Sequence, residues 1–243
     1  MKFIFTLFFC IYVQAIYSIG LYKKGDTVYN CSAAEVKLHA DSNSKSKIVT
    51  VLNASEECIV IDYNIKKTPY TVIEIKPKKD AEDDFKGFSL SGFWVKVKTN
   101  DGKTGYVFDS YLSKIKPGLE LSKSYFDQEF KLMKSKIKKP DPKKDNTYSS
   151  SYVYKNGASI IENGSDYDAH TTYFIPNISL EEAYFLLKTS DRIPVSQDSG
   201  AYGISIQFDG NELSFSSISE SVSIKKVDGR TGEGVDILFE AFD

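Results

Sequence analysis

Residues that most often carry catalysis or bind metals are scarce in this chain. Its 243 residues include three cysteines, two histidines and one tryptophan. No CxxC pair occurs, so the chain lacks the spacing of a structural zinc site and of a thiol redox centre. The second half has no cysteine and one histidine, His170, which argues against a Cys–His peptidase or a zinc amidase there. A Ser–His–Asp triad is compatible with the composition, but no Gly-x-Ser-x-Gly elbow appears. We therefore expect no catalytic residue, no metal site and no cofactor, and we predict a protein that is not an enzyme.

An excess of positive charge is also missing. Lysine and arginine total 31 against 33 acidic residues, which gives a net charge of −2. Without a basic field over the whole protein, we expect no nucleic-acid partner. The lysines are nevertheless concentrated between residues 114 and 144.

No apolar run is long enough to cross a membrane comfortably. The longest one, residues 3–13, follows Met1-Lys2, whereas a membrane span takes about 20 residues. This arrangement predicts a signal peptide over residues 1–18, cleaved near Ala15 or Ser18, and hence export of a mature chain without a transmembrane helix. The alternatives are an uncleaved anchor, a buried strand, or lipidation at Cys10, although that cysteine is not preceded by the small residues of a lipobox.

Removal of the signal peptide leaves two cysteines, Cys31 and Cys58. In an oxidising compartment such a pair is a disulfide candidate, and closing a loop of about 27 residues would stabilise the fold by about 3–4 kcal/mol. Two separate buried thiols are the equally open alternative.

Short segments with alternating polar and apolar residues follow one another through the first half, as half-buried strands do. They lie at residues 35–39, 48–52 and 58–63, after a polar lead-in over residues 19–30, and an extra strand is expected at residues 70–75. The most informative stretch is Phe93–Lys98, then Asp101–Val107. Asn100-Asp101-Gly102 supplies a tight turn between its two strands, because glycine tolerates positive φ.

These segments resemble bacterial SH3-like (SH3b) domains over about residues 25–116. Residues 36–42 resemble the family's opening, and residues 48–52 and 58–61 its next two strands. Residues 94–97 and 105–112 match its "WxKV…GYV…YL" ending most closely. The resemblance implies an SH3-like barrel, which we place at residues 19–117. The sequence departs from the family pattern at His39, where arginine is common, at Asp41-Ser42, and in a long insertion between Ile65 and Gly92.

The resemblance also implies a groove that binds a peptide, a protein or peptidoglycan. The candidate ligand-binding residues are Trp94, Tyr106, Phe108, Asp109, Tyr111 and Tyr63. Aromatic side chains suit such a groove because they offer flat apolar area with a polar tip. Tyr111 is expected to be exposed. The alternative for Trp94 and Tyr106 is that they close the barrel core.

Residues 118–147 are predicted to be a connector, an amphipathic helix followed by a Pro/Lys linker. Ser124 would cap the helix, and Pro140 would stop it. Its apolar stripe would be Phe126, Phe130, Met133 and Ile137, with lysines on the other faces. A helix that binds a membrane surface or a partner is the alternative.

The second half, residues 148–243, is predicted to be an antiparallel α+β domain of about six strands and one helix, and it resembles no family. Asn156-Gly157 predicts a type I′ hairpin, and the capping box Ser179–Glu182 predicts the start of the helix. His170 is taken as an ordinary strand residue. The acidic residues Glu162, Asp166 and Asp168 could hold Ca²⁺, but a solvated loop is the simpler interpretation. The fold class is thus mainly β.

Together these features predict an exported, non-enzymatic binding protein whose oligomeric state stays open. The first alternative is a cell-envelope hydrolase with catalysis in residues 148–243. It would require His170 to meet carboxylates and a hydroxyl in one pocket. The second is an inhibitor or immunity-type protein, which would show an exposed apolar patch on the second domain.

Overall fold

The computed structural model describes residues 22–63, 70–75, 88–117, 121–139, 146–190, 193, 205–217, 219–229 and 232–242. The predicted signal peptide, with both cleavage positions and Cys10, lies outside the described residues, as does most of the long insertion. None of the helices in the described part has the length and hydropathy that crossing a bilayer requires.

The first half of the chain is an antiparallel barrel-like sheet of seven strands, in the order β3-β2-β8-β7-β4-β1-β9. The strands are β1 (Thr27–Asn30), β2 (Val36–His39), β3 (Ile48–Leu52), β4 (Glu57–Tyr63), β7 (Trp94–Thr99), β8 (Thr104–Phe108) and β9 (Leu112–Ser113). A 3₁₀ helix, η1 (Asp109–Tyr111), joins the last two, and β5 (Tyr70–Ile75) pairs separately with β6 (Phe88–Gly92). The predicted barrel is confirmed.

The barrel core follows from the alternation along its strands. Val95 and Val97 point inward from β7 and pack with Val60, Leu38 and Val107 in one buried cluster. At the β7–β8 turn only Gly102 has positive φ, +86°. Local patterning therefore accounts for this half of the fold.

The predicted connector helix is wrong beyond its first two turns. Helix α1 covers Lys123–Glu129 and is capped by Ser122 rather than Ser124. The chain then enters strand β10 (Leu132–Lys138), which pairs with β11. Phe126 is buried and Phe130 is half-buried in the hydrophobic core that the second half of the chain forms. The rest of the apolar stripe, Met133 and Ile137, is exposed on the strand, because pairing with β11 overrides the helical spacing.

The second half forms an eight-stranded sheet, in the order β10-β11-β12-β13-β17-β16-β15-β14, where we expected about six strands. Its further strands are β11 (Tyr148–Tyr154), β12 (Ser159–Gly164), β13 (Asp168–Pro176), β14 (Ser205–Phe208), β15 (Glu212–Ser216), β16 (Glu220–Gly229) and β17 (Gly232–Phe242). The turn between β11 and β12 is not type I′, because Gly157 has positive φ and Asn156 does not.

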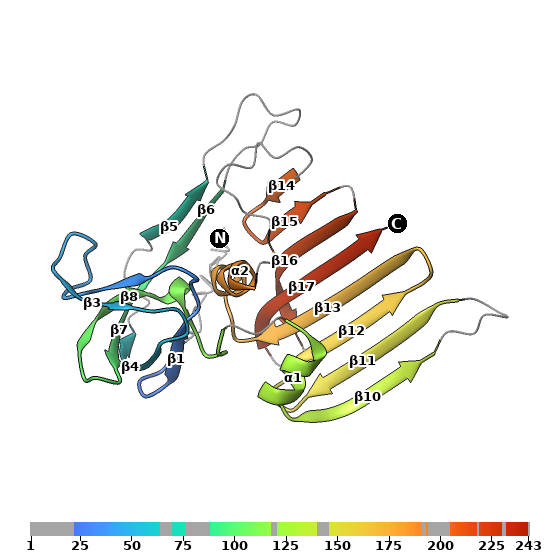
Figure 1. Ribbon diagram of the computed structural model, residues 1–243, viewed down its shortest axis with the longest axis horizontal. Coiled ribbons are helices and arrows are strands. Elements are labelled where there is room, and N and C mark those ends of the chain that lie inside the picture. The colour runs from blue at the N-terminus through green and yellow to red at the C-terminus, as the bar shows by residue number, and fades with distance from the viewer. Residues whose placement is uncertain are drawn as a thin grey trace, which may run out of the picture.

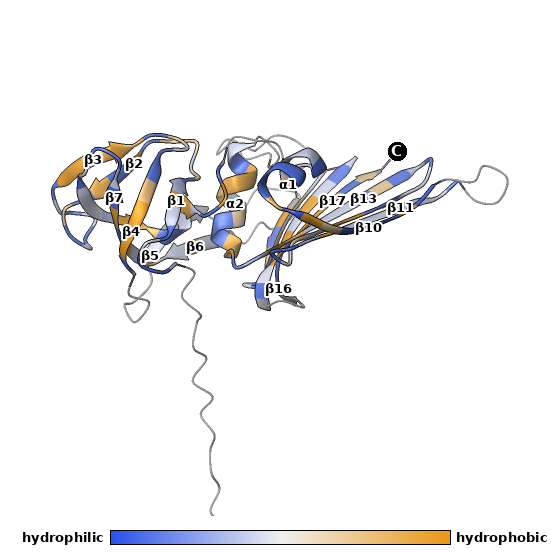
Figure 2. Ribbon diagram, turned by 90° about the horizontal axis from the view of Figure 1, so that it is seen from below, coloured by the Kyte–Doolittle hydropathy of each residue, from blue (hydrophilic) through white to orange (hydrophobic). Residues whose placement is uncertain are grey.

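Helix α2 (Leu180–Thr189) joins the two halves. The predicted capping box is confirmed, since the Ser179 hydroxyl accepts a hydrogen bond of 3.0 Å from the Glu182 amide. In both ribbon views α2 lies between the barrel and the large sheet (Figure 1, Figure 2). On the barrel side the ring of Phe185 lies 4.8 Å from that of Tyr111, and Thr189 donates to the Cys31 carbonyl at 2.6 Å. The two halves therefore share one apolar junction.

Of the two alternatives for the cysteines, this structure has the separate buried thiols rather than the disulfide. Cys31 and Cys58 are both free and fully buried. Cys58 lies in the barrel core, whereas Cys31 packs with the junction around α2. The two thiols point into different cores, a fact that their spacing in the sequence does not reveal.

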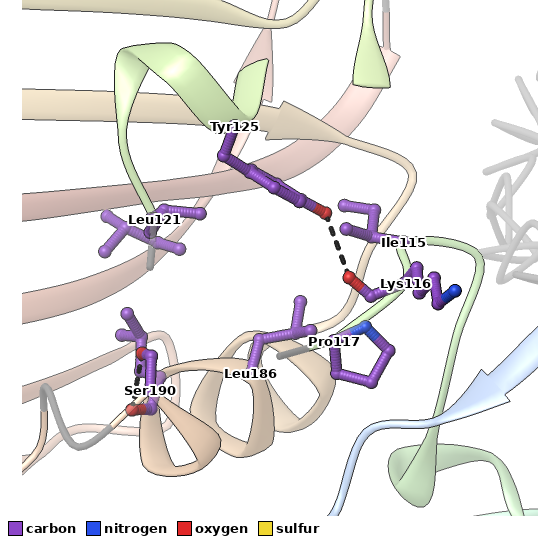
Figure 3. Close-up of a pocket in the computed structure, with 9 residues that line it drawn as sticks. Ile115, Lys116, Pro117, Leu121, Tyr125, Leu186 and Ser190 are labelled. Atoms are coloured by element: carbon purple, nitrogen blue, oxygen red, sulfur yellow. Dashed lines mark hydrogen bonds between the residues drawn. The ribbon is translucent and has the colours of Figure 1, made fainter. Parts of the chain in front are cut away.

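A small cavity remains in this junction (Figure 3). It measures about 20 Å³ and is lined mainly by Ile115, Pro117, Leu121, Tyr125 and Leu186. The Tyr125 hydroxyl donates to the Lys116 carbonyl at 3.4 Å along its wall. A space of this size holds about one water molecule, so it is a packing gap rather than a ligand site.

Candidate functional site

A groove of about 250 Å³ opens where strands β2 and β8 separate. The two strands are in register only at His39 and Tyr106, and the groove is lined on one side by residues 32–37 and on the other by residues of β7, β8 and η1. The groove is lined by Ser32, Ala34, Glu35, Val36, Lys37, His39, Trp94, Val107, Phe108 and Tyr111. Its volume lies just below the range of small-molecule pockets and suits a short peptide segment or one ring.

The floor of the groove is aromatic. The Trp94 ring stacks on Phe108 with 4.0 Å between centroids, and the His39 ring meets Trp94 edge-on at 5.5 Å. Trp94 is 3% exposed, yet it points away from the barrel core, because its neighbour Val95 occupies the inner face of β7. Trp94 therefore lines the groove and does not fill the barrel. Its companion Tyr106 lies outside the groove, with the Lys96 ammonium 5.6 Å from its ring.

Tyr111 closes one end of the groove. We expected it to be exposed, but it is half-buried, because it packs between Phe108 at 6.4 Å and Phe185 of α2 at 4.8 Å. Burial raises the pKa of its hydroxyl. The second domain thus shapes the groove through α2.

The remaining predicted residues, Asp109 and Tyr63, lie outside the groove and hold η1 in place. The Asp109 carboxylate accepts hydrogen bonds of 2.8 Å from the Tyr63 hydroxyl and from the Phe93 amide. Burial raises the pKa of Asp109 to about 6. Asp109 is therefore a positioning residue for the loop that carries Tyr111.

The sequence-based prediction missed the wall formed by residues 32–37. Glu35 and Lys37 are exposed there and give the rim one charge of each sign. The position of this segment depends on where β2 leaves β8, which is a tertiary feature. The one available signal was that its last two residues, Val36 and Lys37, begin the segment that resembles the SH3b opening.

The Glu182 carboxyl is a further buried polar group, which the sequence predicted only as part of a helix-capping box. Glu182 is 1% exposed at the junction, and Tyr22 of the barrel donates to its Oε2 at 3.3 Å. Tyr22 also donates to the Leu112 carbonyl at 2.5 Å. Burial raises the pKa of Glu182 to about 8. A carboxyl that favours its neutral form therefore lies where the two domains meet.

His170 does meet carboxylates, on the face of the large sheet opposite the buried core. Its Nδ1 lies 3.1 Å from Glu240 Oε1, and its Nε2 lies 3.2 Å from Asp168 Oδ2. The neighbouring hydroxyls of Ser221 and Ser165 donate to those two carboxylates. Both ring nitrogens thus face acceptors, and the hydroxyls are directed away from the ring. Within the described ranges, no group of three or more His, Cys, Asp or Glu residues is arranged to hold a metal ion.

Comparison with known proteins separates the two halves of the chain. No curated protein and no solved structure matches it. The C-terminal half matches no family model. Residues 34–113, which contain most of the barrel and nearly the whole groove, match the family described as the bacterial SH3 domain, so the first half of this chain carries a bacterial SH3 domain.

Proposed function

We propose that this chain is an exported, non-enzymatic binding protein whose barrel holds a peptide or a cell-wall component in the groove floored by Trp94 and Phe108. The observation that carries the proposal is the set of stacked rings on the outer face of β7 and β8, outside the barrel core. Bacterial SH3 domains often bind peptidoglycan or peptides, which agrees with this assignment.

The chemistry of the groove favours a short peptide. The Trp94–Phe108 stack offers a flat apolar floor, against which a backbone or an aliphatic side chain can pack. At the rim, Glu35 suits an amine and Lys37 a carboxylate. A peptide that carries both groups could pair with this wall through its charges and with the floor through an apolar side chain.

The geometry around His170 supports a binding role over hydrolysis. A general base needs a ring nitrogen within reach of the proton that it removes. Here the two nitrogens lie against Glu240 and Asp168, and the hydroxyls of Ser221 and Ser165 donate to carboxylates instead. We therefore place the function in the groove rather than in the second domain.

The test is retention of the purified mature chain on insoluble peptidoglycan, with isothermal titration of soluble stem peptides. We expect Phe108→Ala to weaken binding at least about tenfold, as loss of a buried aromatic anchor does. Because this substitution also removes packing from Trp94, the exposed rim variant Lys37→Ala is measured beside it and should weaken binding without lowering thermal stability.

Tyr167→Ala provides the matched control, since Tyr167 is 78% exposed on the other domain. Its binding should equal that of the wild type. Full retention of the Phe108→Ala and Lys37→Ala variants would refute the groove as the binding site. Export is tested separately by fractionating cells that express the full chain, where protein retained in the cytoplasm at its full mass would contradict it.

A further inference from the structure

Strand β10 is an uncovered edge of the eight-stranded sheet. Among the described strands it pairs only with β11, and no element lies beyond it (Figure 1). All seven of its residues are exposed. They include Met133 at 64%, Ile137 at 58% and Leu132 at 41%, which are three of the seven exposed large apolar side chains in the described part of the chain.

The same edge carries charge of one sign. Lys134, Lys136 and Lys138 occupy alternate positions of β10, and Lys131 and Lys139 flank them. Residues 130–139 and 147–156, which contain the whole of β10 and β11, include no acidic residue. Within the described ranges Lys131, Lys134 and Lys136 form no ion pair.

The register with β11 separates the two kinds of side chain. Leu132 lies opposite Tyr154 and Ile137 opposite Ser150, on the face that carries the buried core, while Met133 lies at an irregularity of the pairing between Leu132 and Lys134. The three alternating lysines lie opposite Val153, Ser151 and Ser149, on the other face. The edge therefore presents apolar groups on one side, ammonium groups on the other, and the backbone of β10 between them.

Two simpler explanations of this edge fit less well. Lysines often guard an edge strand against pairing with another chain, but a guarded edge does not need three exposed large apolar side chains within seven residues. A membrane surface would attract the lysines, but it offers no regular set of donors and acceptors to pair with the backbone edge of β10. An added strand satisfies all three features, because it pairs with the backbone, neutralises the lysines and covers the apolar side chains.

We propose that β10 binds an extended acidic segment of a protein partner, which joins the sheet as an added strand. Acidic side chains at every second position of that segment face Lys134 and Lys136. The apolar side chains between them cover Ile137 and Leu132, which share one face of the sheet. This surface is separate from the groove, so the partner and the groove ligand can bind at the same time.

The probe for the test is a peptide of about eight residues in which glutamate and valine alternate, long enough to span β10. Its binding to the full mature chain is followed by fluorescence polarisation, and amide hydrogen exchange is followed over residues 130–139. We expect saturable binding and slower exchange of β10 amides. The double variant Lys134→Glu/Lys136→Glu should bind about tenfold more weakly, since two attractions become repulsions.

The matched control is Lys45→Glu/Lys98→Glu, which makes the same change in net charge at two exposed lysines of the barrel. It should bind like the wild type. A peptide methylated on alternate backbone nitrogens, which cannot pair as a strand, should not bind. No binding of the alternating peptide would overturn the proposal. So would equal binding of the methylated peptide, of a scrambled peptide of the same composition, or of anionic vesicles, because each would show attraction to charge without strand pairing.

Discussion

Glu182 makes the stability of the two-domain junction depend on pH. Its pKa is raised to about 8, against 4.5 for the ordinary side chain, because the carboxyl is buried between α2 and the barrel. A raised pKa means that the folded state binds the proton more tightly than the unfolded state. The stability that protonated Glu182 contributes to the folded state is therefore complete below about pH 4.5, and this contribution is lost as the pH rises towards 8.

The size of the effect follows from the shift. One pKa unit corresponds to about 1.4 kcal/mol, so at pH 7 the unfavourable contribution of Glu182 is about 3 kcal/mol. Between pH 5 and pH 8 the wild type should lose roughly 3 kcal/mol of unfolding free energy through this group. Asp109, whose pKa is raised to about 6 by burial, adds a smaller loss of about 1 kcal/mol that is nearly complete by pH 7.

The perturbation is Glu182→Gln, which removes the ionisable group and keeps an acceptor for the Tyr22 hydroxyl. Urea unfolding at pH 5 and pH 8 should show that the variant is the more stable protein at pH 8 and that most of the pH dependence has gone. Glu181→Gln removes the same charge from the preceding, half-buried position of α2 and should keep the wild-type slope. An unchanged slope in the Glu182→Gln variant would refute this account of the junction.

Three further predictions concern packing. Gly105→Ala should destabilise the barrel by about 1–3 kcal/mol in urea unfolding, because the new Cβ would lie 2.6 Å from the His39 carbonyl oxygen; an unchanged midpoint would contradict the close approach. Cys31 and Cys58 should stay unalkylated in the native protein and react fully after denaturation without reductant, and a mass two hydrogens lower for the unmodified chain would reveal a disulfide instead. Tyr111→Ala should lower stability by about 2–3 kcal/mol as well as weaken groove binding, since the ring packs on α2; a loss of binding alone would mean that the ring is not part of the junction.

The barrel could be predicted from the sequence because its signals are local. The run of β-branched residues at 48–51, the alternation in residues 94–98 and the turn glycine at 102 each act within a few residues, and the structure has strands and a turn there. The capping box at Ser179 was predictable for the same reason.

The errors arose where distant pairing decides the structure. Phe126, Phe130, Met133 and Ile137 are spaced like a helical stripe, whereas the lysines from 134 to 138 alternate like a strand. Only the presence of β11 selects the strand. Cysteine spacing likewise could not show that Cys31 and Cys58 point into different cores.

Only part of the candidate groove could be predicted from the sequence, because one of its walls depends on contacts between distant segments. Trp94, Phe108 and Tyr111 could be named because they lie in the segment with the clearest family pattern. The opposite wall, residues 32–37, depends on where β2 separates from β8. Asp109 and Tyr63, which were also predicted, hold η1 in place and do not line the groove. Glu182 escaped notice because a capping box gives the start of a helix but not what packs against it.

The chain offers a direct measurement of its central claim, because Trp94 is its only tryptophan and lies in the groove. Titration of the mature chain with soluble peptidoglycan stem peptides should change the tryptophan emission with a saturable curve, and the Lys37→Ala variant should shift that curve to higher concentration. The titration is run beside calorimetry on the same samples. Calorimetric binding with unchanged Trp94 emission, or no binding at all, would contradict the assignment of the groove as the ligand site.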